Sequence, residues 1–443
     1  MAGGEQSWVI ETEKRLKDWD PSLELELWSK HSIYRLPACI KDLNSKAYRP
    51  QIVSFGPFHH GETQLRPMEE HKHRALLHFL RRAKKPLEEF VIAMEEVVEQ
   101  LQDAYENLDE DWRVHKDRFL QLMIVDGCFM MEVMRVANWG QNDYASNDPI
   151  FSLHGILYTV SYIKRDMLMI ENQLPLLVLD KLNAVETGKF KDEDHINKMV
   201  LRFLAASPIA ARTSIGGLGL HPLDVFRKSM LQGQYPSARR RHSEPASNEI
   251  IRSALELYEA GIRFKKSKSN SLRDIRFRHG VLHLPVIVVD DATEFLFLNL
   301  MAFERLHVGA GNEVTSYVFF MDNIIDSAKD VSLLNSNGII QNAVGSDKAV
   351  AKLFNGLSKD VALDPESSLD DVHRMVNAYC RKPWNMWRAN LIHTYFRSPW
   401  AFLSLAAAIF LLVMTILQTI YTVIPYYQGQ SPPPSPPTAP SPQ

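Results

Sequence analysis

Five histidines lie close together in the sequence, and metal binding is the chemistry that such a group could support: His59, His60, His71, His73 and His78. Metal ligands must converge on one point. His59 and His60 are adjacent in an expected loop, while His71 and His73 are two positions apart on an expected helix and therefore face different directions. The sequence contains no HExxH. We interpret these histidines as structural or surface residues, and we expect no metal and no cofactor.

Other candidate catalytic residues in the sequence also favour a structural interpretation. Asp290 and Asp291 could act as paired carboxylates, but their position after an apolar run favours roles in a turn and a helix cap. The stretch GGLGL from Gly216 to Leu220 lacks the preceding strand and the glycine spacing of a dinucleotide-binding loop. The sequence contains no phosphate-binding loop, no GxSxG and no kinase catalytic loop. It therefore offers no recognisable catalytic signature.

A short basic motif around Ser243 has the pattern of a regulatory site. Arg239, Arg240 and Arg241 precede Ser243, and Pro245 follows it by two residues. A basophilic kinase could phosphorylate Ser243, and the phosphate could form bidentate pairs with the neighbouring guanidinium groups. A phosphoserine-binding adaptor could then recognise the segment. The alternative interpretation is a solvated basic linker.

The composition indicates a reducing compartment and no nucleic-acid partner. The formal net charge is −3 and the pI is about 6.6, without the basic domain that a nucleic-acid binder usually carries. Cys39, Cys128 and Cys380 show no CxxC spacing. The first residues, 1–17, lack the apolar core of a signal peptide, and Ala2 stands where myristoylation needs glycine. We therefore expect neither secretion nor an N-terminal lipid anchor.

Helices are expected to position most of these side chains. Residues 87–108 show apolar side chains at spacings of three and four, which predicts one amphipathic helix opened by Pro86. Residues 119–136 are apolar on more than one face, which predicts a buried helix. Asp126 and Glu132 are its polar exceptions and need buried partners.

A third helix is predicted over residues 166–182, with Asp166 as its N-cap and a kink at Pro175. Proline removes one backbone hydrogen bond and crowds the preceding turn. The polar residues Glu171, Asn172 and Gln173 would then lie where the helix is opened, which suggests an internal hydrogen-bond network.

The remaining pattern predicts an exposed linker over about 212–248 and then a mixture of helices with little strand. We expect helices over 249–261, 315–334, 347–358 and 368–396, a strand over 282–289, and a helix from about 291 with Asp291 and Glu294 as an approximate capping box. Strands are too few for a doubly wound sheet. The predicted fold class is mainly α, or α+β with few short strands.

An apolar segment near the C-terminus predicts a transmembrane helix. Residues 401–424 contain no charge, and such a helix is about 36 Å long, enough to cross a hydrocarbon core of roughly 30 Å. Aromatic residues flank it on both sides. Arg381, Lys382, Arg388 and Arg397 precede it and no charge follows it, so the positive-inside rule places the large domain in the cytosol. A buried core helix is the alternative.

The predicted organisation is an N-terminal segment (1–30), a cytosolic domain (31–396), the transmembrane helix (401–424) and a proline-rich tail (425–443) on the lumenal or extracellular side. The membrane would be the plasma membrane or an endomembrane. The tail sequence GQSPPPSPPTAPSPQ favours extended polyproline II, as a stalk or ligand.

Nine stretches, in order between residues 31 and 427, resemble one plant-specific family, the domain of unknown function 247. They are IYRLPACIKDLNSKAYRPQIVSFGPFHHG from Ile33, MEEHKHRAL from Met68, VDGCFMMEV from Val125, DMLMIENQLPLLVLDKL from Asp166, YEAGIRFK from Tyr258, LHLPVIVVDDATEFLFLNLMAFE from Leu282, SYVFFMDNIIDSAKDV from Ser316, GSDKAVAKLFN from Gly345 and YFRSPWAFLS from Tyr395. The resemblance implies a plant source and a C-terminal membrane segment. The tail and the basic motif lie outside it.

The resemblance also marks polar motif positions where a site would first be sought: His59, His60, Glu69, His71, Asp126, Glu171, Asn172 and Gln173. We interpret them as buried networks that fix helix packing. Members of the family have been linked to pollen-side self-incompatibility in grasses and to development and stress, so the resemblance implies recognition or signalling. We expect a membrane-tethered interaction or signalling protein with an unknown protein partner. The alternative is a membrane-anchored enzyme that uses these polar residues.

Overall fold

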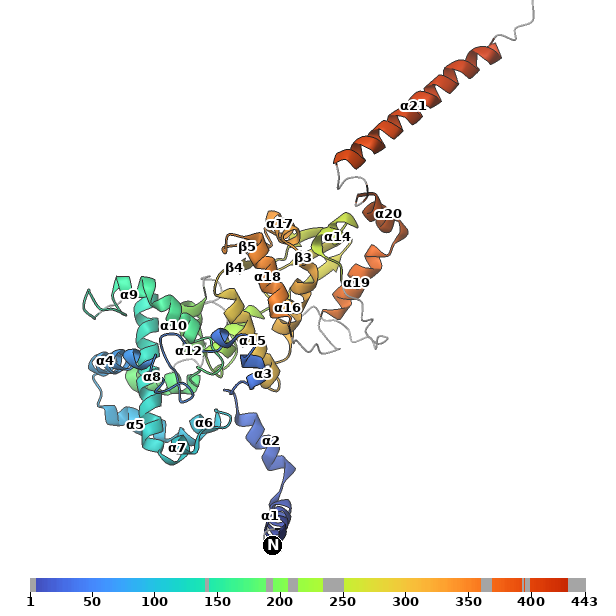
Figure 1. Ribbon diagram of the computed structural model, residues 1–443. Coiled ribbons are helices and arrows are strands. Elements are labelled where there is room, and N and C mark those ends of the chain that lie inside the picture. Colours follow the sequence, from blue (N-terminus) through green and yellow to red (C-terminus); the bar gives the residue numbers. More distant parts are fainter. Residues whose placement is uncertain are drawn as a thin grey trace, which may run out of the picture.

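The structure is a computed structural model that describes residues 5–139, 143–188, 194–205, 214–233, 251–359, 369–392, 394 and 399–428. It is mainly helical, with few short strands and one long apolar C-terminal helix, as the sequence predicts (Figure 1). The buried apolar residues form two clusters, and Leu168 packs against both. One cluster is made by the N-terminal half, and the other mainly by residues 251–380 with residues 34–48 packed into it.

Helix α8 is the centre of the N-terminal half. It packs against α4, α5, α7, α11 and α12, which surround it. Gly127 lies where α11 crosses α8, because a Cβ atom there would stand 2.6 Å from Leu182 and 2.8 Å from Val178. The helices of this half are α1 (Glu5–Asp18), α2 (Pro21–Lys30), α3 (Ala38–Lys41), η1 (Ser45–Ala47), α4 (Arg66–Ala83), α5 (Leu87–Glu95), α6 (Val98–Asp103), α7 (Glu110–Val114), α8 (Lys116–Trp139), α9 (Leu153–Tyr158), α10 (Val160–Asp166), α11 (Leu176–Thr187), α12 (Asp194–Leu204) and α13 (Pro222–Met230).

The C-terminal half combines helices with two small sheets. In the first sheet the order is β1-β3-β2, with β1 parallel and β2 antiparallel to β3, and in the second β4 is parallel to β5. Phe264, Leu282 and Phe277 share one register row and are all buried. The elements are α14 (Ala254–Glu259), β1 (Arg263–Lys266), β2 (Arg276–Arg278), β3 (Val281–Leu284), β4 (Ile287–Val289), α15 (Thr293–Leu306), α16 (Glu313–Ile324), α17 (Ala328–Ser336), β5 (Ile340–Asn342), α18 (Asp347–Leu357), α19 (Asp370–Cys380) and α20 (Pro383–Leu391).

Three predicted helices and the predicted strand are each two elements. The 87–108 helix is α5 and α6, because Val97 leaves helical geometry at φ −121° and ψ 7° and both pieces bury apolar side chains in the same core. The 315–334 helix is α16 and α17, where Ser327 and Asp330 form a capping box. The 368–396 helix is α19 and α20, divided before Pro383, and the 282–289 strand is β3 and β4, divided at Pro285.

The predicted helix over 166–182 is wrong in its first half. Helix α10 ends at Asp166 and α11 begins at Leu176, so Pro175 precedes a helix instead of kinking one. The residue before a proline disfavours helical geometry, and a proline itself suits a helix start. Asp166 is not an N-cap, because its carboxylate accepts hydrogen bonds from the distant amides of residues 51–53.

Other boundaries shift less. The predicted linker over 212–248 contains α13, which begins at a buried cap, His221; residues 234–250 lie outside the described part. The 249–261 helix is the shorter α14, and the helix over 347–358 is confirmed as α18. Helix α15 begins at Thr293, and Asp290, not Asp291, accepts the hydrogen bonds of Ala292 and Thr293 there.

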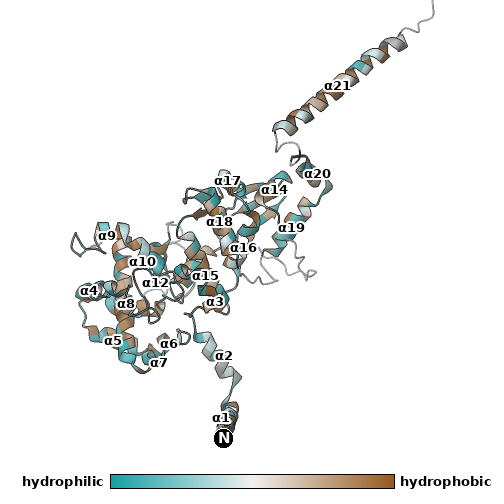
Figure 2. Cartoon of the chain, viewed as in Figure 1, coloured by the Kyte–Doolittle hydropathy of each residue, from teal (hydrophilic) through white to brown (hydrophobic). Residues whose placement is uncertain are grey.

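The last helix, α21 (Pro399–Gln428), extends away from the rest of the molecule (Figure 1). Its segment from Trp400 to Ile424 has a mean hydropathy of 2.5, and none of it is buried. Figure 2 shows mostly apolar colour along this helix, interrupted by a few pale or teal residues, and the segment carries no charged residue. By length and composition α21 could cross a membrane.

Candidate functional site

Several polar motif residues gather around one irregular segment, residues 51–59, which lies between α8, the 167–175 connection and the start of α4. His71 is not one of them, since its charged neighbours are Arg74, Asp148 and Glu70. Gly56 is required at its centre. Its φ is +69°, and a Cβ atom would stand 2.6 Å from the Tyr105 hydroxyl and 2.8 Å from the Gln173 carbonyl. The segment has no strand or helix partner, so side chains must satisfy its backbone groups.

Asp166 and Asn172 bind the first part of this segment. The Asp166 carboxylate accepts hydrogen bonds from the amides of Gln51, Ile52 and Val53 at 2.8–3.1 Å. Asn172 accepts from the Phe55 amide at 2.8 Å and donates to the Val53 carbonyl at 3.0 Å. Burial raises the pKa of Asp166 to about 6, against the opposing effect of the three amides.

Gln173 fixes the connection that carries these residues. Its Nε2 donates to the carbonyls of Met167 at 2.7 Å and Met169 at 2.6 Å, and its Oε1 accepts from the Leu223 amide at 3.1 Å. Its own carbonyl accepts from the Tyr105 hydroxyl at 3.0 Å. One side chain thereby joins the 167–175 connection to the start of α13.

A buried ion pair lies beneath Gly56. The Lys72 Nζ atom is 2.7 Å from Asp126 Oδ1, and both side chains are 0% exposed. The same Nζ atom is 2.7 Å from Glu69 Oε1 and 3.2 Å from Ser54 Oγ, while Asp126 Oδ2 accepts from the Gly56 amide at 2.8 Å. Burial raises the pKa of Asp126, and Lys72 opposes that shift. Such charges persist in a core only when they are paired and hydrogen-bonded.

Glu171 makes a second buried cluster. Its Oε1 accepts from the Leu36 amide at 2.6 Å, and its Oε2 lies 2.6 Å from Lys41 Nζ. His59 Nε2 is 3.4 Å away, an ion-pair distance without hydrogen-bond geometry, while His59 Nδ1 contacts Glu62 at 2.6 Å. Burial opposes ionisation of Glu171 most strongly, but the contacts with His59, Lys41 and the Leu36 amide together lower its pKa.

The five histidines are in separate surroundings. His60 packs edge-on against Trp112, and His73 Nδ1 lies 2.8 Å from the Glu69 carbonyl of its own helix. His78 stacks on Tyr144. Burial, followed by Arg74, lowers the pKa of His71. Within the described residues no group of three or more His, Cys, Asp and Glu side chains could hold a metal ion.

Sequence reasoning missed Lys72 and Lys41, the two cations of these clusters. A signal for Lys72 was present, because Met68, Lys72, Ala75 and Phe79 follow helical spacing and all are buried on one face of α4. No comparable signal marks Lys41, which comes from a different part of the chain than Glu171. The basic motif residues Arg240, Arg241, Ser243 and Pro245 lie outside the described residues.

The network is suited to positioning backbone, since most of its acceptors and donors contact main-chain groups of residues 36–56, 167–173 and 223. Glu69, Asp126 and Glu171 are the ionisable members that pair with lysines. Ser54 and His59 lie close to these carboxylates, so the cluster contains the groups that acid–base chemistry would need. All of them are buried except Glu69, whose side chain is 23% exposed.

Comparison with known proteins places the chain in a plant family. The model of the family described as "Plant protein of unknown function", DUF247, matches residues 33–414. The UPF0481 protein At3g47200 of Arabidopsis thaliana is 32% identical over 435 residues, covering 92% of this chain and 90% of that protein. A second Arabidopsis thaliana UPF0481 protein, At3g02645, is 24% identical over 517 residues, covering 94% of each. No solved structure matches. The chain belongs to the plant DUF247 (UPF0481) family.

Proposed function

We propose that this chain is a membrane-tethered interaction protein, anchored by α21, with its helical domain in the cytosol. The observation that carries the proposal is the exposure of the whole 25-residue segment Trp400–Ile424. A helix of this length is about 37 Å long and can span a hydrocarbon core of roughly 30 Å. Soluble proteins rarely leave so large an apolar surface in water, whereas lipid solvates it.

Charge supports the orientation. Arg381, Lys382 and Arg388 lie on the N-terminal side of α21 and no charged residue follows Arg397, so the positive-inside rule favours a cytosolic domain and a lumenal or extracellular tail. Trp384 and Trp387 of α20 are 74% and 69% exposed. They precede the apolar segment closely enough to lie in the interfacial layer of the same leaflet.

Figure 1 shows β3 close to α14 at the end of the domain from which α20 leads to α21. The sheet β1-β3-β2 carries a row of basic residues. Arg263 and Arg278 both pair with Val281 of β3, and Lys265 and Arg276 both pair with His283. These residues lie on the face opposite the buried Phe264 row. The four cations are exposed, and α20 packs against α14 beside the start of β1. We define Arg263, Lys265, Arg276 and Arg278 as the basic face. Anionic lipid of the cytosolic leaflet would attract it.

The network around residues 51–59 supports an interaction scaffold better than an enzyme. Asp166, Asn172 and Gln173 are bound to backbone groups, and a substrate would have to displace those bonds. The enzyme alternative is favoured by one observation, the acid, lysine and serine groups at Glu69, Lys72 and Ser54. Turnover of a metabolite mixture by the purified full-length chain, lost in Glu69→Gln, would support that alternative.

Carbonate extraction and protease protection test the anchor. We expect the full-length chain to stay with the membrane after carbonate, and a matched variant with Leu411→Arg and Met414→Arg to become soluble, because each arginine at the centre of a span costs about 3 kcal/mol. Protease outside sealed microsomes should digest the domain and leave a short protected fragment with α21 and the tail. A soluble wild-type chain, or a protected domain, would contradict the proposal.

Phosphorylation of Ser243 and its binding by a phosphoserine-reading adaptor remain a separate proposal, supported by the basic motif alone. Phosphopeptide mapping of the chain from its membrane tests it. Detection of neighbouring peptides with Ser243 always unmodified would count against this regulation.

A further inference from the structure

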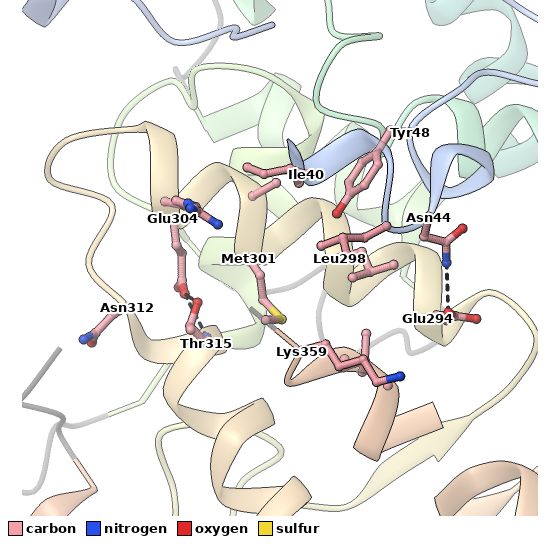
Figure 3. Close-up of a pocket in the computed structure, with 15 residues that line it drawn as sticks. Ile40, Asn44, Tyr48, Glu294, Leu298, Met301, Glu304, Asn312, Thr315 and Lys359 are labelled. Carbon is pink, nitrogen blue, oxygen red and sulfur yellow. Dashed lines mark hydrogen bonds between the residues drawn. The ribbon is translucent and has the colours of Figure 1, made fainter. Parts of the chain in front are cut away.

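A cavity of about 480 Å³ lies between the N-terminal segment 40–48 and the helices α15, α16 and α18 (Figure 3). We call it the α15 cavity. Its walls come from four parts of the chain that are far apart in the sequence, so only the folded domain forms it. The volume is in the range of pockets that bind small organic molecules.

The walls of the α15 cavity are mostly apolar. Leu298 and Met301 of α15 and Leu357 at the end of α18 line it. Figure 3 shows the Leu298 and Met301 side chains directed into the space between the helices. An apolar ligand body would remove this surface from water. The cavity lies apart from the network around residues 51–59, and none of the network residues lines it.

Tyr48 supplies an unused hydrogen-bond donor. Its side chain is 3% exposed, and its hydroxyl group has no hydrogen-bond partner among the residues that the structure describes. Figure 3 shows this hydroxyl directed into the cavity above Leu298. Burial raises the pKa of Tyr48 to about 12, so the hydroxyl keeps its proton at neutral pH. The ring is buried, but the hydroxyl oxygen is not one of the fully enclosed unpartnered atoms, so a ligand in the cavity can reach it and accept its hydrogen bond.

The acidic residues around the cavity already have hydrogen-bond partners, whereas its two basic residues have no ion-pair partner among the described residues. Glu304 is already used, because it accepts from Val314, Thr315 and Arg227. Glu294 accepts from Asn44 at 2.9 Å at the rim. Arg305 and Lys359 also line the cavity, are exposed, and make no ion pair within the described residues. Cations are thus the charges available to a ligand.

We propose that the α15 cavity binds a small amphipathic acid, whose apolar body lies against Leu298, Met301 and Leu357 and whose acidic group accepts a hydrogen bond from Tyr48 and pairs with Arg305. Two observations carry this assignment: the Tyr48 hydroxyl, which has no partner among the described residues and is directed into the cavity, and Arg305, which lines the same cavity without an ion pair among those residues. It is independent of the membrane anchor, since no residue of α20 or α21 lines the cavity.

A matched pair of probes tests the site: 1-naphthoate and 1-naphthamide, which share an aromatic body and differ in charge. Binding to the full-length chain in nanodiscs is measured by saturation-transfer difference NMR, with empty nanodiscs as the blank. We expect naphthoate to bind and naphthamide to bind about tenfold more weakly, the size of a charged hydrogen bond. Equal binding of both probes, or no naphthoate binding at millimolar concentration, would overturn the proposal.

Two tyrosine variants separate the site from general effects. Tyr48→Phe should weaken naphthoate binding about tenfold without lowering the melting temperature, because no protein hydrogen bond is lost. Tyr317→Phe is the matched control, since Tyr317 is a buried tyrosine whose enclosed hydroxyl has no partner among the described residues, and it does not line the cavity. It should bind naphthoate as the wild type does. Unchanged binding in Tyr48→Phe, or equal losses in both variants, would refute the role of Tyr48.

Discussion

The Lys72→Met substitution tests whether the buried ion pair holds residues 51–59 in place. Methionine is similar in length to lysine and flexible, so the change removes the charge with little change in packing. In the wild type Lys72 Nζ is 2.7 Å from both Asp126 and Glu69. In the variant Asp126 keeps the Gly56 amide as a donor but loses its counter-charge.

The expected cost follows from the burial of both partners. Breaking a fully buried pair by removing one side chain costs about 3–5 kcal/mol, against about 0–1 kcal/mol for an exposed pair. Burial raises the pKa of Asp126 even beside Lys72, and without Lys72 this pKa should rise further. A carboxyl group whose pKa is raised by folding stabilises the folded state at low pH and loses that contribution as the pH rises. We therefore expect Lys72→Met to be more destabilising at about pH 8 than at about pH 5.

Hydrogen exchange of the full-length chain in nanodiscs gives the local measurement. Peptides that contain Val53 to Gly56 should exchange about a hundredfold faster in Lys72→Met, if 3 kcal/mol of local stability is lost. Lys116→Met is the control, because Lys116 pairs with Glu99 at 3.1 Å on the surface, where the side chains are 49% and 82% exposed. If Lys72→Met exchanges no faster than Lys116→Met, the ion pair does not stabilise this segment and the reasoning is wrong.

Three further predictions follow from the same structure. Gly56→Ala should lower the free energy of chemical unfolding by about 2 kcal/mol or more. Gly188→Ala is the control, because Gly188 also has a positive φ (+64°) but open space around it, and it should lose only about 1 kcal/mol. Equal losses would show that the contact with Tyr105 is unimportant. Folding raises the pKa of Asp166 from 3.8 to about 6, so the contribution of Asp166 to the free energy of unfolding is lost as the pH rises through that range. Asp166→Asn should remove this pH dependence, which amounts to at most about 1.4 kcal/mol per pH unit. If the free energy of unfolding of the variant changes with pH as that of the wild type does, the prediction is wrong. The double variant Lys265→Glu, Arg278→Glu tests docking of the basic face on anionic lipid, with energy transfer measured from a fluorophore on Ser269→Cys to acceptor lipids. Energy transfer should fall in nanodiscs that contain phosphatidylserine and stay unchanged in neutral nanodiscs. No change in either would exclude docking of the basic face.

The sequence alone predicts those helices whose formation depends only on the pattern of residues within the helix. The 401–424 segment carries no charge and is apolar on nearly every face, so no tertiary partner is needed to predict a long helix there. Helices α8 and α18 agree with their predictions within three residues at each end, because each has a continuous apolar pattern. The choice of a mainly helical fold rests on the same periodicity.

Tertiary structure decides where long apolar patterns divide. Residues 87–108 and 315–334 keep helical spacing across their breaks, since both pieces of each bury apolar side chains in one core. Periodicity therefore cannot show the break. The direction of the second piece depends on the surface it covers, and that surface comes from elsewhere in the chain.

The polar motif shows the same limit most clearly. The sequence marks Asp126, Glu171, Asn172 and Gln173 as polar groups in apolar surroundings, which predicts buried partners but does not name them. Asp166 reads locally as a helix cap, yet its three donors are amides more than 100 residues away. Likewise, nothing in the sequence around Tyr48 indicates a binding site, because the cavity that its side chain lines is formed with α15 and α18 from distant parts of the chain. The type of a residue determines which hydrogen-bond or charge partner it needs when buried, but only the tertiary structure determines which residue supplies that partner.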